Sequence, residues 1–373
     1  MKSFIPQYVE AVCQELKIVS GAAAEKIKIG TIFFGGGTPS LLSVPQYKRI
    51  LEVSRECFEM NETSEITIEA NPGTVNREYL QGIREAGVNR ISFGMQSAHH
   101  DDLHILDRQH QHEDVINSVA WSKEAGFEHI NLDLIFGIPG QSLTRWNETL
   151  DLALAEKIDH FSLYSLIVEE GTPMHHWVER GLLESPDEDL AADMYETAMD
   201  RLDKAGFLQY EISNWARLGE TDNRCQHNLQ YWRFLPYLGI GAGAHGFINA
   251  IRTENVGGIP EYIQRLKNDQ PTAFPGSPAG KPAEKLSTWD MMQEFMMVGF
   301  RLTDEGVSDN DFHALFGQSM NAVFNKQIDH LLKQGLIERH PQSQSRLRLT
   351  RRGKLFGNQV FAQFVGNDLP AEM

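Results

Sequence analysis

The chain has 373 residues, of which 34 are Lys or Arg and 51 are Asp or Glu, so its formal net charge at pH 7 is −17. This length predicts two or three domains with a sizeable core, and 41% hydrophobic with 23% charged residues excludes wholesale disorder. The acidic balance argues against a partner held through a nucleic-acid phosphate backbone.

No integral membrane segment is expected. The most apolar stretch, residues 234–251, contains Pro236, four glycines, His245 and Asn249, which predicts a turn-rich loop rather than a membrane span. The amino terminus runs straight into a helical pattern near residue 7 without the features of a signal peptide. We therefore predict a cytoplasmic location.

Six apolar segments predict strands separated by helices. They are residues 29–34, 65–69, 89–93, 130–134, 161–166 and 210–213. Three of the helices end in Ala-Gly and an apolar residue, with glycines at 87, 126 and 206, and glycine just past a helix end adopts the left-handed cap. Strands and helices that alternate at this interval predict an α/β fold with a parallel sheet, open or closed into a barrel.

Polar residues gather where the predicted strands end. A glycine-rich turn at 35–39 follows the first strand, Glu69 ends the second, Gln96 follows the third and Asp133 lies in the fourth. Since the carboxyl ends of parallel strands form one rim, these residues predict a shared ligand site. Taken singly, the glycines also suit a tight turn, and the carboxylates suit either structural ion pairs or the ribose hydroxyls or ammonium group of a ligand.

The pattern changes after residue 215, which predicts three parts: 1–215, 216–286 and 287–373. The middle part is rich in Asn, aromatics and Gly and ends in a proline-rich linker. The last part predicts three helices through Phe295, Phe312 and Ile328, then a hairpin and a final helix, an order that resembles a winged helix. The arginines of its hairpin region, at 346, 348, 351 and 352, are interpreted as a solvated face or a partner surface rather than a DNA site.

Four motifs, in order and spacing, resemble the radical S-adenosylmethionine proteins related to anaerobic coproporphyrinogen oxidase. They are GGGTPSLL at 35–42, EANP at 69–72, RISFGMQS at 90–97 and NLDLIFGIPG at 131–140. The resemblance covers essentially the whole chain and implies a partial (β/α)₆ barrel that holds S-adenosylmethionine across its top. Carried over by position, it assigns contacts with this ligand to Gly36, Gly37, Thr38, Glu69, Gln96, Arg108, Asp133, Ile167 and Phe247.

A further motif, HNLQYW at 227–232, fits the His-Asn-x-x-Tyr-Trp pattern of the HemW-like heme chaperones in that family. An imidazole can ligate heme iron, and tyrosine and tryptophan offer faces to a porphyrin. We therefore expect His227 to ligate heme iron, with Arg224 and Arg233 placed to pair with propionates. His245 and Cys225 are alternative ligands, and a loop histidine that is merely hydrogen-bonded or solvated is the plainer interpretation.

The family's radical chemistry depends on a [4Fe–4S] cluster held by a Cys-x-x-x-Cys-x-x-Cys loop. The three cysteines here, at 13, 57 and 225, lack that spacing, and Cys13 and Cys57 are expected to be buried on helix faces. The first barrel strand and the cluster loop are therefore expected to be missing from this sequence. Either translation begins at Met1, or the start was assigned too far downstream, which is the alternative we favour. Whether the chain is an enzyme stays open, and these 373 residues are not expected to cleave S-adenosylmethionine reductively.

Two functions follow from the resemblance. The first is a heme-binding chaperone that transfers heme to a client protein, with S-adenosylmethionine and the cluster serving regulation or formation of a homodimer. The second is an oxygen-independent coproporphyrinogen III oxidase, which decarboxylates propionates with a 5′-deoxyadenosyl radical in porphyrin biosynthesis. The HNLQYW motif and the compact length favour the first. A third alternative is an unrelated barrel enzyme whose glycine loop binds phosphate.

Overall fold

The computed structural model describes residues 2–267 and 270–366, and the chain divides into two compact units. The sheet unit consists of Phe33–Ser43 and Glu65–Arg224. The terminal unit consists of Met1–Ile32, Val44–Ser64 and Cys225–Met373. Because these units interleave along the chain, they do not address the domain boundaries expected after residues 215 and 286, which stay a prediction.

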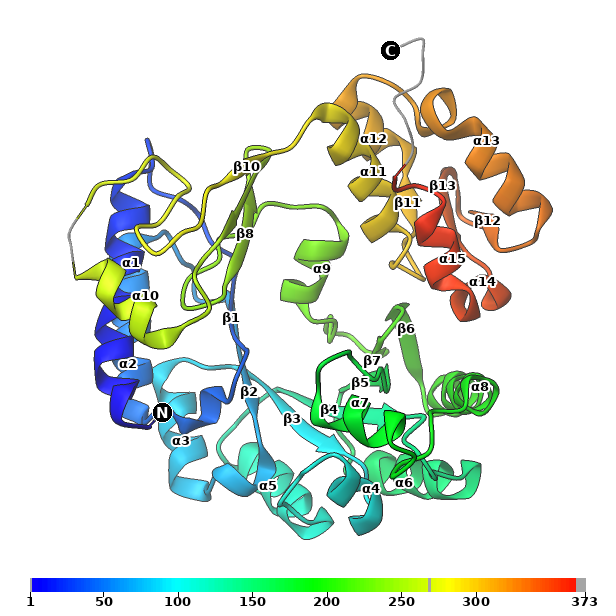
Figure 1. Ribbon diagram of the computed structural model, residues 1–373, viewed down its shortest axis with the longest axis horizontal. Coiled ribbons are helices and arrows are strands. Elements are labelled where there is room, and N and C mark those ends of the chain that lie inside the picture. Colours follow the sequence, from blue (N-terminus) through cyan, green and yellow to red (C-terminus); the bar gives the residue numbers. More distant parts are fainter. Residues whose placement is uncertain (1, 268–269, 367–373) are drawn as a thin grey trace. The chain divides into compact units, whose positions relative to one another are not determined.

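A seven-stranded sheet with the order β1-β2-β3-β4-β5-β7-β6 forms the core of the sheet unit (Figure 1). Its strands are β1 (Thr31–Phe34), β2 (Glu65–Ala70), β3 (Arg90–Gln96), β4 (His129–Phe136), β5 (His160–Ser165), β6 (Phe207–Glu211) and β7 (Asn214–Arg217). β1 crosses the boundary between the units. β2 to β5 run parallel to one another in chain order. The α/β class with a parallel sheet is therefore confirmed.

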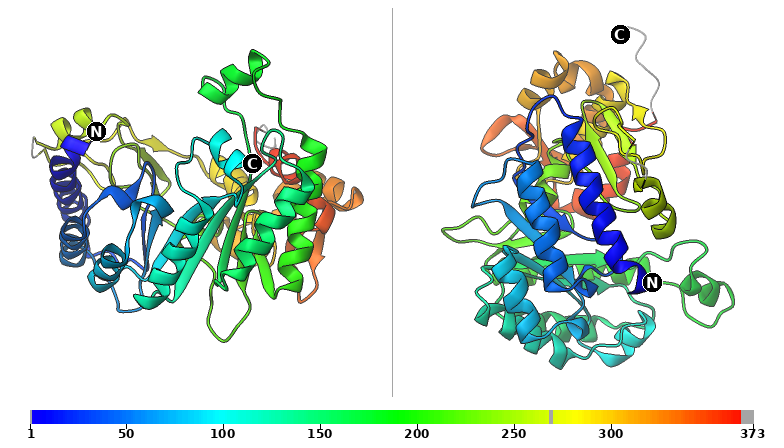
Figure 2. Two further views of the ribbon diagram at one scale, coloured as in Figure 1. Left: turned by 90° about the horizontal axis from the view of Figure 1, so that it is seen from below. Right: turned by 90° about the vertical axis from the view of Figure 1, so that its left-hand side faces the viewer.

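Helices alternate with these strands, and most of them lie along the outer side of the sheet (Figures 1 and 2). They are α3 (Arg77–Ala86), α4 (His100–Ile105), α5 (His112–Glu124), α6 (Leu143–Ala155), α7 (Pro173–Glu179) and α8 (Glu188–Lys204). The expected glycine caps are confirmed, since φ is 114° at Gly87, 84° at Gly126 and 82° at Gly206. Each cap ends a helix and lets the chain enter the next strand.

The sixth predicted strand, residues 210–213, is confirmed only for residues 210 and 211, because residues 212 and 213 form a turn. β6 ends at Glu211, and the chain turns back into β7, which pairs antiparallel with both β6 and β5. In the turn, the Glu211 carboxylate accepts a 3.0 Å hydrogen bond from the backbone N–H of Ser213 and another from the Asn214 side-chain amide. A carboxylate that stabilises its own turn leaves no signal in a hydrophobicity pattern.

In the terminal unit, a buried carboxylate joins helices and loops that are far apart in the sequence. The elements before its last module are α1 (Ile5–Gly21), α2 (Val44–Cys57), α9 (Gln226–Trp232), β8 (His245–Ile248), β9 (Ile251–Glu254), α10 (Ile259–Leu266) and β10 (Glu284–Lys285). Glu15 of α1 is fully buried and accepts hydrogen bonds from the Tyr262 hydroxyl, the Asn255 amide and the Gly241 backbone N–H. The stretch 234–251, expected to be a loop throughout, includes strand β8.

The carboxyl-terminal module has the predicted winged-helix-like order. It comprises α11 (Thr288–Gly299), β11 (Val307–Ser308), α12 (Asp309–Phe316), α13 (Met320–Lys333), β12 (Ile337–His340), β13 (Ser343–Leu349), α14 (Arg351–Leu355) and α15 (Gly357–Ala362). α11 begins with a capping box between Ser287 and Asp290. In the hairpin, Arg348 lies 2.9 Å from the Glu338 carboxylate, an ion pair typical of a solvated protein surface.

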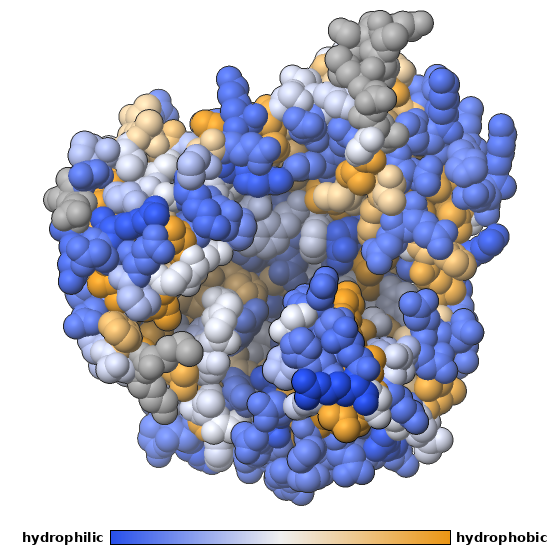
Figure 3. Space-filling view, in the orientation of Figure 1, coloured by the Kyte–Doolittle hydropathy of each residue, from blue (hydrophilic) through white to orange (hydrophobic). Residues whose placement is uncertain are grey.

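The surface agrees with the acidic composition. Hydrophilic side chains dominate the face drawn in Figure 3, and hydrophobic ones appear there as separate patches. Within the part of the chain that the structure describes, no helix is both long and apolar enough to cross a membrane.

Candidate functional site

The polar residues predicted at the strand ends lie on neighbouring strands of the sheet unit. Glu69, next to last in β2, is in register with Ser92 of β3, and Ser92 is in register with Asn131 of β4. Asp133 lies two residues further along β4, opposite Ser162 of β5. The parallel register therefore places the two carboxylates on strands that flank β3.

Glu69 is half-buried and contacts the glycine-rich turn after β1. Its Oε2 atom accepts a 3.2 Å hydrogen bond from the backbone N–H of Gly36. Gly36 and Gly37 have φ of +75° and +59°, a left-handed backbone that favours glycine and turns the N–H group toward the carboxylate. Burial, and then the charge of Asp133, raise the pKa of Glu69. A ligand that brings positive charge or hydroxyl donors would stabilise the ionised form.

Asp133 is held by hydrogen bonds from three strands. Its Oδ2 accepts from the Ser92 hydroxyl at 2.8 Å, its Oδ1 accepts from the Asn131 amide at 2.8 Å, and Ser162 donates as well. Burial raises the pKa of Asp133, while these bonds and the nearby Arg108 charge lower it. These hydrogen bonds therefore fix the orientation of the carboxylate, but they and Arg108 balance only part of its negative charge.

The residues that hydrogen-bond to Asp133 belong to a network in which each donor and acceptor can be assigned. The Asn131 amide donates to both Asp133 and the Ser92 hydroxyl, so its carbonyl oxygen must accept from Nδ1 of His160, 2.6 Å away. Nε2 of His160 then accepts from the Tyr210 hydroxyl at 2.8 Å. Burial holds the pKa of His160 well below its ordinary value, so the imidazole is neutral. This buried network therefore holds the Asp133 carboxylate in its orientation.

Gln96 ends β3 in a conformation that needs a neighbouring glycine. Its φ is +64°, and only 8% of its surface is exposed. A Cβ atom on Gly94 would lie 2.7 Å from the Gln96 amide nitrogen. The glycine of the Phe-Gly-Met-Gln segment therefore leaves room for the side chain that follows it.

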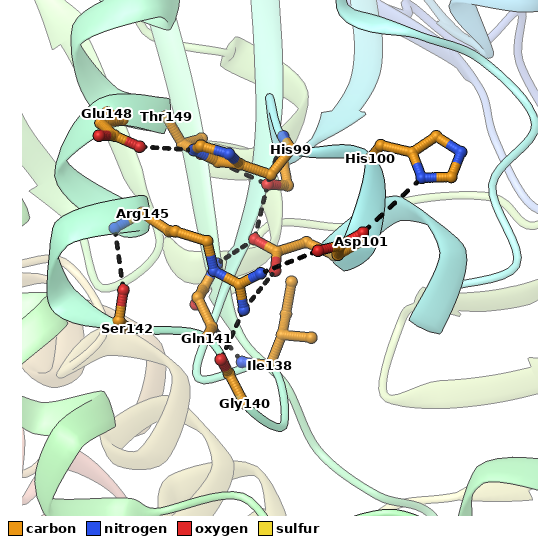
Figure 4. Close-up of polar contacts among 12 residues, drawn as sticks. His99, His100, Asp101, Ile138, Gly140, Gln141, Ser142, Arg145, Glu148 and Thr149 are labelled. Atoms are coloured by element: carbon orange, nitrogen blue, oxygen red, sulfur yellow. Dashed lines mark hydrogen bonds and ion pairs between the residues drawn. The ribbon is translucent and has the colours of Figure 1, made fainter.

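A buried polar network joins the loop after β3 to the loop after β4 (Figure 4). Asp102 of α4, fully buried, accepts from the Ser97 hydroxyl at 2.8 Å and from the Gln141 amide at 3.1 Å, and lies 3.2 Å from the Arg145 guanidinium. The Gln141 carbonyl in turn accepts from the Gly137 backbone N–H at 3.0 Å. Sequence reasoning missed these residues, because Asp102 and Gln141 are 39 positions apart and no local pattern links them.

The other residues predicted to contact the ligand differ in their exposure and in the unit to which they belong. Thr38 directly precedes a short 3₁₀ helix, Pro39–Leu41, that follows the glycine turn. Arg108 is exposed after α4, and Ile167 is 76% exposed after β5. Phe247 belongs to the terminal unit, where it is buried in β8 and packs 4.9 Å from the Phe234 ring centre. The assignment of all nine residues to a ligand stays a prediction.

The HNLQYW segment forms most of helix α9 in the terminal unit. His227 and Tyr231 lie one turn apart on the same face, with 2.8 Å between the imidazole Nε2 and the tyrosine hydroxyl oxygen. The other ring nitrogen, Nδ1, lies 2.8 Å from the Thr31 hydroxyl, 196 positions away in the sequence. Cys225, one of the two alternative ligands, is the residue before the helix and is buried.

The Tyr231 hydroxyl determines what the imidazole of His227 can do. Burial, followed by Tyr237 and Cys225, raises the pKa of Tyr231 to about 12, so its hydroxyl is protonated at neutral pH and can donate to Nε2. When Tyr231 donates, Nδ1 carries the ring proton and donates to Thr31; in the other tautomer Nε2 donates to Tyr231 and Nδ1 accepts from Thr31. A metal ion that binds at Nε2 must displace the Tyr231 hydroxyl, while the bond to Thr31 can keep the ring oriented.

Both arginines expected to pair with propionates already have carboxylate partners. In the terminal unit, Arg233 holds Glu305 through two nitrogens, at 3.1 and 2.5 Å. In the sheet unit, Arg224 holds Asp222 at 2.8 and 2.7 Å. Trp232 packs under Arg301, whose guanidinium carbon lies 4.3 Å from the ring centre. The Arg233–Glu305 and Trp232–Arg301 contacts attach α9 and the residue after it to the segment after α11.

The cysteines of this chain do not fit a [4Fe–4S] cluster. Cys13 is buried in α1 as expected, and burial raises its pKa to about 11, whereas a cluster ligand must be a thiolate. Cys57, at the end of α2, is half-buried rather than buried. Across residues 2–267 and 270–366, the single group of three or more His, Cys, Asp or Glu side chains with converging ligand atoms contains no cysteine.

Family models match two parts of the chain. The Radical SAM superfamily model matches residues 5–153, and the HemN C-terminal domain model matches residues 286–356. The solved structure of coproporphyrinogen III oxidase (HemN) from Escherichia coli superposes with a TM-score of 0.81 at 20% identity, covering 98% of this chain and 84% of that one. This likeness confirms the predicted radical-SAM fold.

Relatives of higher identity align over most of the chain. Heme chaperone HemW of Bacillus subtilis is 39% identical over 363 residues, which cover 97% of this chain and 92% of that protein. Heme chaperone HemW of Lactococcus lactis is 35% identical, with 98% and 91% covered. The mitochondrial radical S-adenosyl methionine domain-containing protein 1 of Mus musculus is 36% identical, with 83% and 70% covered.

Proposed function

We propose that this chain, which belongs to the HemW family of radical S-adenosylmethionine proteins, is a heme chaperone that binds heme at α9 and delivers it to client proteins. The family membership rests on relatives named heme chaperones that align along nearly their whole length. Heme is the cargo in this proposal, and the client is a protein that receives it.

The observation that carries the proposal is the pair of hydrogen bonds on His227. A heme ligand must be a neutral imidazole with an accessible nitrogen lone pair, held in a fixed orientation. Tyr231 at Nε2 and Thr31 at Nδ1, each at 2.8 Å, support that state. A hydroxyl is a modest competitor for a metal, since a typical hydrogen bond contributes only about 0.5–1.5 kcal/mol net. Iron can therefore replace Tyr231 without disturbing the other bond.

Aromatic rings beside His227 suit a flat ligand. The Tyr231 ring meets His227 edge-on, with 5.0 Å between ring centres, and meets Tyr237 edge-on at 4.6 Å. Trp232 is half-buried under Arg301. Aromatic side chains contribute a large contact area to a porphyrin. Because Arg233 is already paired with Glu305, a propionate would have to share it or bind elsewhere.

We also propose that S-adenosylmethionine binds at the rim of the sheet unit. The support comes from two carboxylates, Glu69 and Asp133, whose pKa values are raised because their negative charge is only partly balanced. The Gly36 N–H group, which donates to Glu69, lies beside them. An amino acid's ammonium group or ribose hydroxyls are the donors such a site suits. Radical SAM proteins pair this ligand with a [4Fe–4S] cluster, but the cysteines of these 373 residues do not provide its ligands. The predicted homodimer and cytoplasmic location likewise stay predictions.

Heme binding and transfer test the proposal together. The whole chain is titrated with hemin, and the loaded protein is then mixed with an apo-heme protein such as apomyoglobin while the absorption spectrum is followed. We expect one heme per chain and complete movement of heme to the acceptor without unfolding. Failure to bind heme stoichiometrically would overturn the proposal. Turnover of coproporphyrinogen III in its place would favour the oxidoreductase alternative.

A further inference from the structure

A group of potential metal ligands lies on α7, outside the residues assigned so far. His175, His176 and Glu179 each offer one ligand atom, and the three atoms lie within 4.8 Å of one another. Figure 2 shows this short helix standing away from the other helices and strands of its own unit. His176 and Glu179 are exposed and His175 is half-buried, and none of the three belongs to β2 or β4, the strands that carry Glu69 and Asp133.

The spacing within the group is close to that of a metal site. Nδ1 of His176 lies 3.4 Å from Oε2 of Glu179, and Nδ1 of His175 lies 3.7 Å from the same oxygen. Ligands at about 2.0–2.2 Å from a tetrahedral zinc ion are separated from one another by about 3.3–3.6 Å. A small side-chain adjustment would bring the three atoms into one coordination sphere.

Hydrogen bonding alone does not account for this arrangement. Nδ1 of His175 is buried and finds no hydrogen-bond partner among the residues that the structure describes, since 3.7 Å to Glu179 exceeds hydrogen-bond range. Glu179 can accept from one imidazole at 3.4 Å, but both imidazoles point to the same carboxylate oxygen. An ordinary helical His–Glu pair would involve a single histidine. A cation between the three groups would satisfy the buried nitrogen as well.

The backbone around the group is locally fixed. The Thr172 hydroxyl caps α7 by accepting from the backbone N–H of His175 at 3.2 Å, and it donates to the Glu169 carbonyl at 2.6 Å. The helix closes at Gly181, whose φ is +66° and whose N–H donates to the Val178 carbonyl at 3.0 Å. The ligands thus sit on a closed, capped turn rather than on a loose loop.

We infer that His175, His176 and Glu179 form a binding site for a divalent transition metal ion of the zinc class. Two imidazole nitrogens and one carboxylate oxygen are ligands that Zn²⁺ accepts readily, whereas Mg²⁺ and Ca²⁺ require mostly oxygen ligands. Three protein ligands leave a fourth position for water or for a donor from another molecule. The inference does not depend on heme binding, because none of the three residues belongs to α9.

Zinc titration of the whole metal-stripped chain tests this site. Isothermal titration calorimetry is run with ZnCl₂ on the unchanged chain and on the variants His175→Ala, His176→Ala and Glu179→Gln. His330→Ala, which removes an exposed helical histidine of α13, is the matched control, and circular dichroism checks that each variant is folded. A Co²⁺ titration, read by visible absorption, reports the coordination geometry independently of the heat signal.

We expect the unchanged chain to bind one zinc ion. Each of the three variants should lower the zinc affinity by at least about 10-fold, because even the loss of a residue that only supports a metal ligand usually costs that much. The control should bind like the unchanged chain, Mg²⁺ should not compete, and Co²⁺ should give the intense bands of a tetrahedral site. Zinc affinity that is unchanged in the His175→Ala and His176→Ala variants would overturn the inference, as would the absence of zinc binding by the unchanged chain.

Discussion

Nε2 of His227 lies 2.8 Å from the hydroxyl oxygen of Tyr231, four positions further along the same helix. With its pKa raised to about 12, this hydroxyl keeps its proton at neutral pH, and in the tautomer with the ring proton on Nδ1 it occupies the Nε2 lone pair that heme iron would need. Under the proposed function, heme and the tyrosine hydroxyl would compete for one nitrogen atom. Such competition would keep the histidine ordered before heme arrives, and it would lower the affinity for heme and so favour release.

Tyr231→Phe should bind heme more tightly than the unchanged chain. Removing the hydroxyl frees Nε2 from a hydrogen bond worth about 0.5–1.5 kcal/mol, so we expect roughly 2- to 10-fold higher affinity, with slower transfer to apomyoglobin. Tyr237→Phe is the control, because its ring meets the Tyr231 ring edge-on and the change leaves the Tyr231 hydroxyl in place. Weaker heme binding by Tyr231→Phe would show that the hydroxyl contacts heme instead.

Glu69→Gln and Asp133→Asn should each weaken S-adenosylmethionine binding. Each loses a charge-assisted contact worth roughly 1.5–3 kcal/mol, which corresponds to roughly a 10- to 100-fold loss of affinity measured by calorimetry. Glu52→Ala, on the exposed face of α2, serves as the control. Unchanged affinity in both rim variants would remove these residues from the ligand site.

Glu69→Gln should also make the ligand-free chain more stable at neutral pH. The pKa of Glu69 is raised above its ordinary value of 4.5 by burial and by Asp133, so the folded chain holds this proton more tightly than the unfolded chain. The free energy of unfolding therefore falls as pH rises from 4.5 through the raised pKa of Glu69. Above that pKa, the full cost of burying the ionised carboxylate is present. Chemical denaturation across this range should show the variant's advantage at pH 7 and its disappearance below pH 4.5; an advantage independent of pH would contradict the argument.

Gly94→Ala should weaken S-adenosylmethionine binding without unfolding the chain. The added Cβ would lie 2.7 Å from the Gln96 amide nitrogen, the movable end of that side chain, so the amide must leave its position while the strand stays in place. We expect the loss of affinity to match that of Gln96→Ala. If Gly94→Ala binds like the unchanged chain, the position of the Gln96 amide does not matter to the ligand.

Glu15→Ala should lower the free energy of unfolding by about 3 kcal/mol or more. Three buried donors, on Tyr262, Asn255 and Gly241, lose their common acceptor, and each unsatisfied donor costs about 1–3 kcal/mol. Tyr262→Phe removes only one of these bonds and should cost about 1 kcal/mol. Equal losses in the two variants, measured by urea denaturation, would show that the carboxylate does not hold the three groups together.

The fold was largely predictable because its signals are local. Apolar runs, the glycine caps at 87, 126 and 206, and the Ser287 cap each depend on a few adjacent residues, and the structure confirms them. The hairpin between β6 and β7 was missed because Glu211 stabilises a turn within an apolar stretch.

The partners of the site residues were less predictable, because they come from distant parts of the chain. Thr31 reaches His227 across 196 positions, and Glu305 reaches Arg233 across 72. Sequence patterns indicated which residues carry chemistry, but they could not show that the His227 nitrogens and the Arg233 guanidinium already have partners. That information depends on tertiary packing.

The Soret band of the hemin-loaded chain shows directly whether His227 ligates heme iron. His227→Ala is compared with the unchanged chain and with His245→Ala, which removes the exposed histidine of β8. We expect a shifted Soret band and weaker heme binding in His227→Ala alone, with circular dichroism unchanged, because the axial bond is lost while the aromatic surroundings remain. A wild-type Soret position in His227→Ala would show that another residue holds the iron and that His227 is not the ligand.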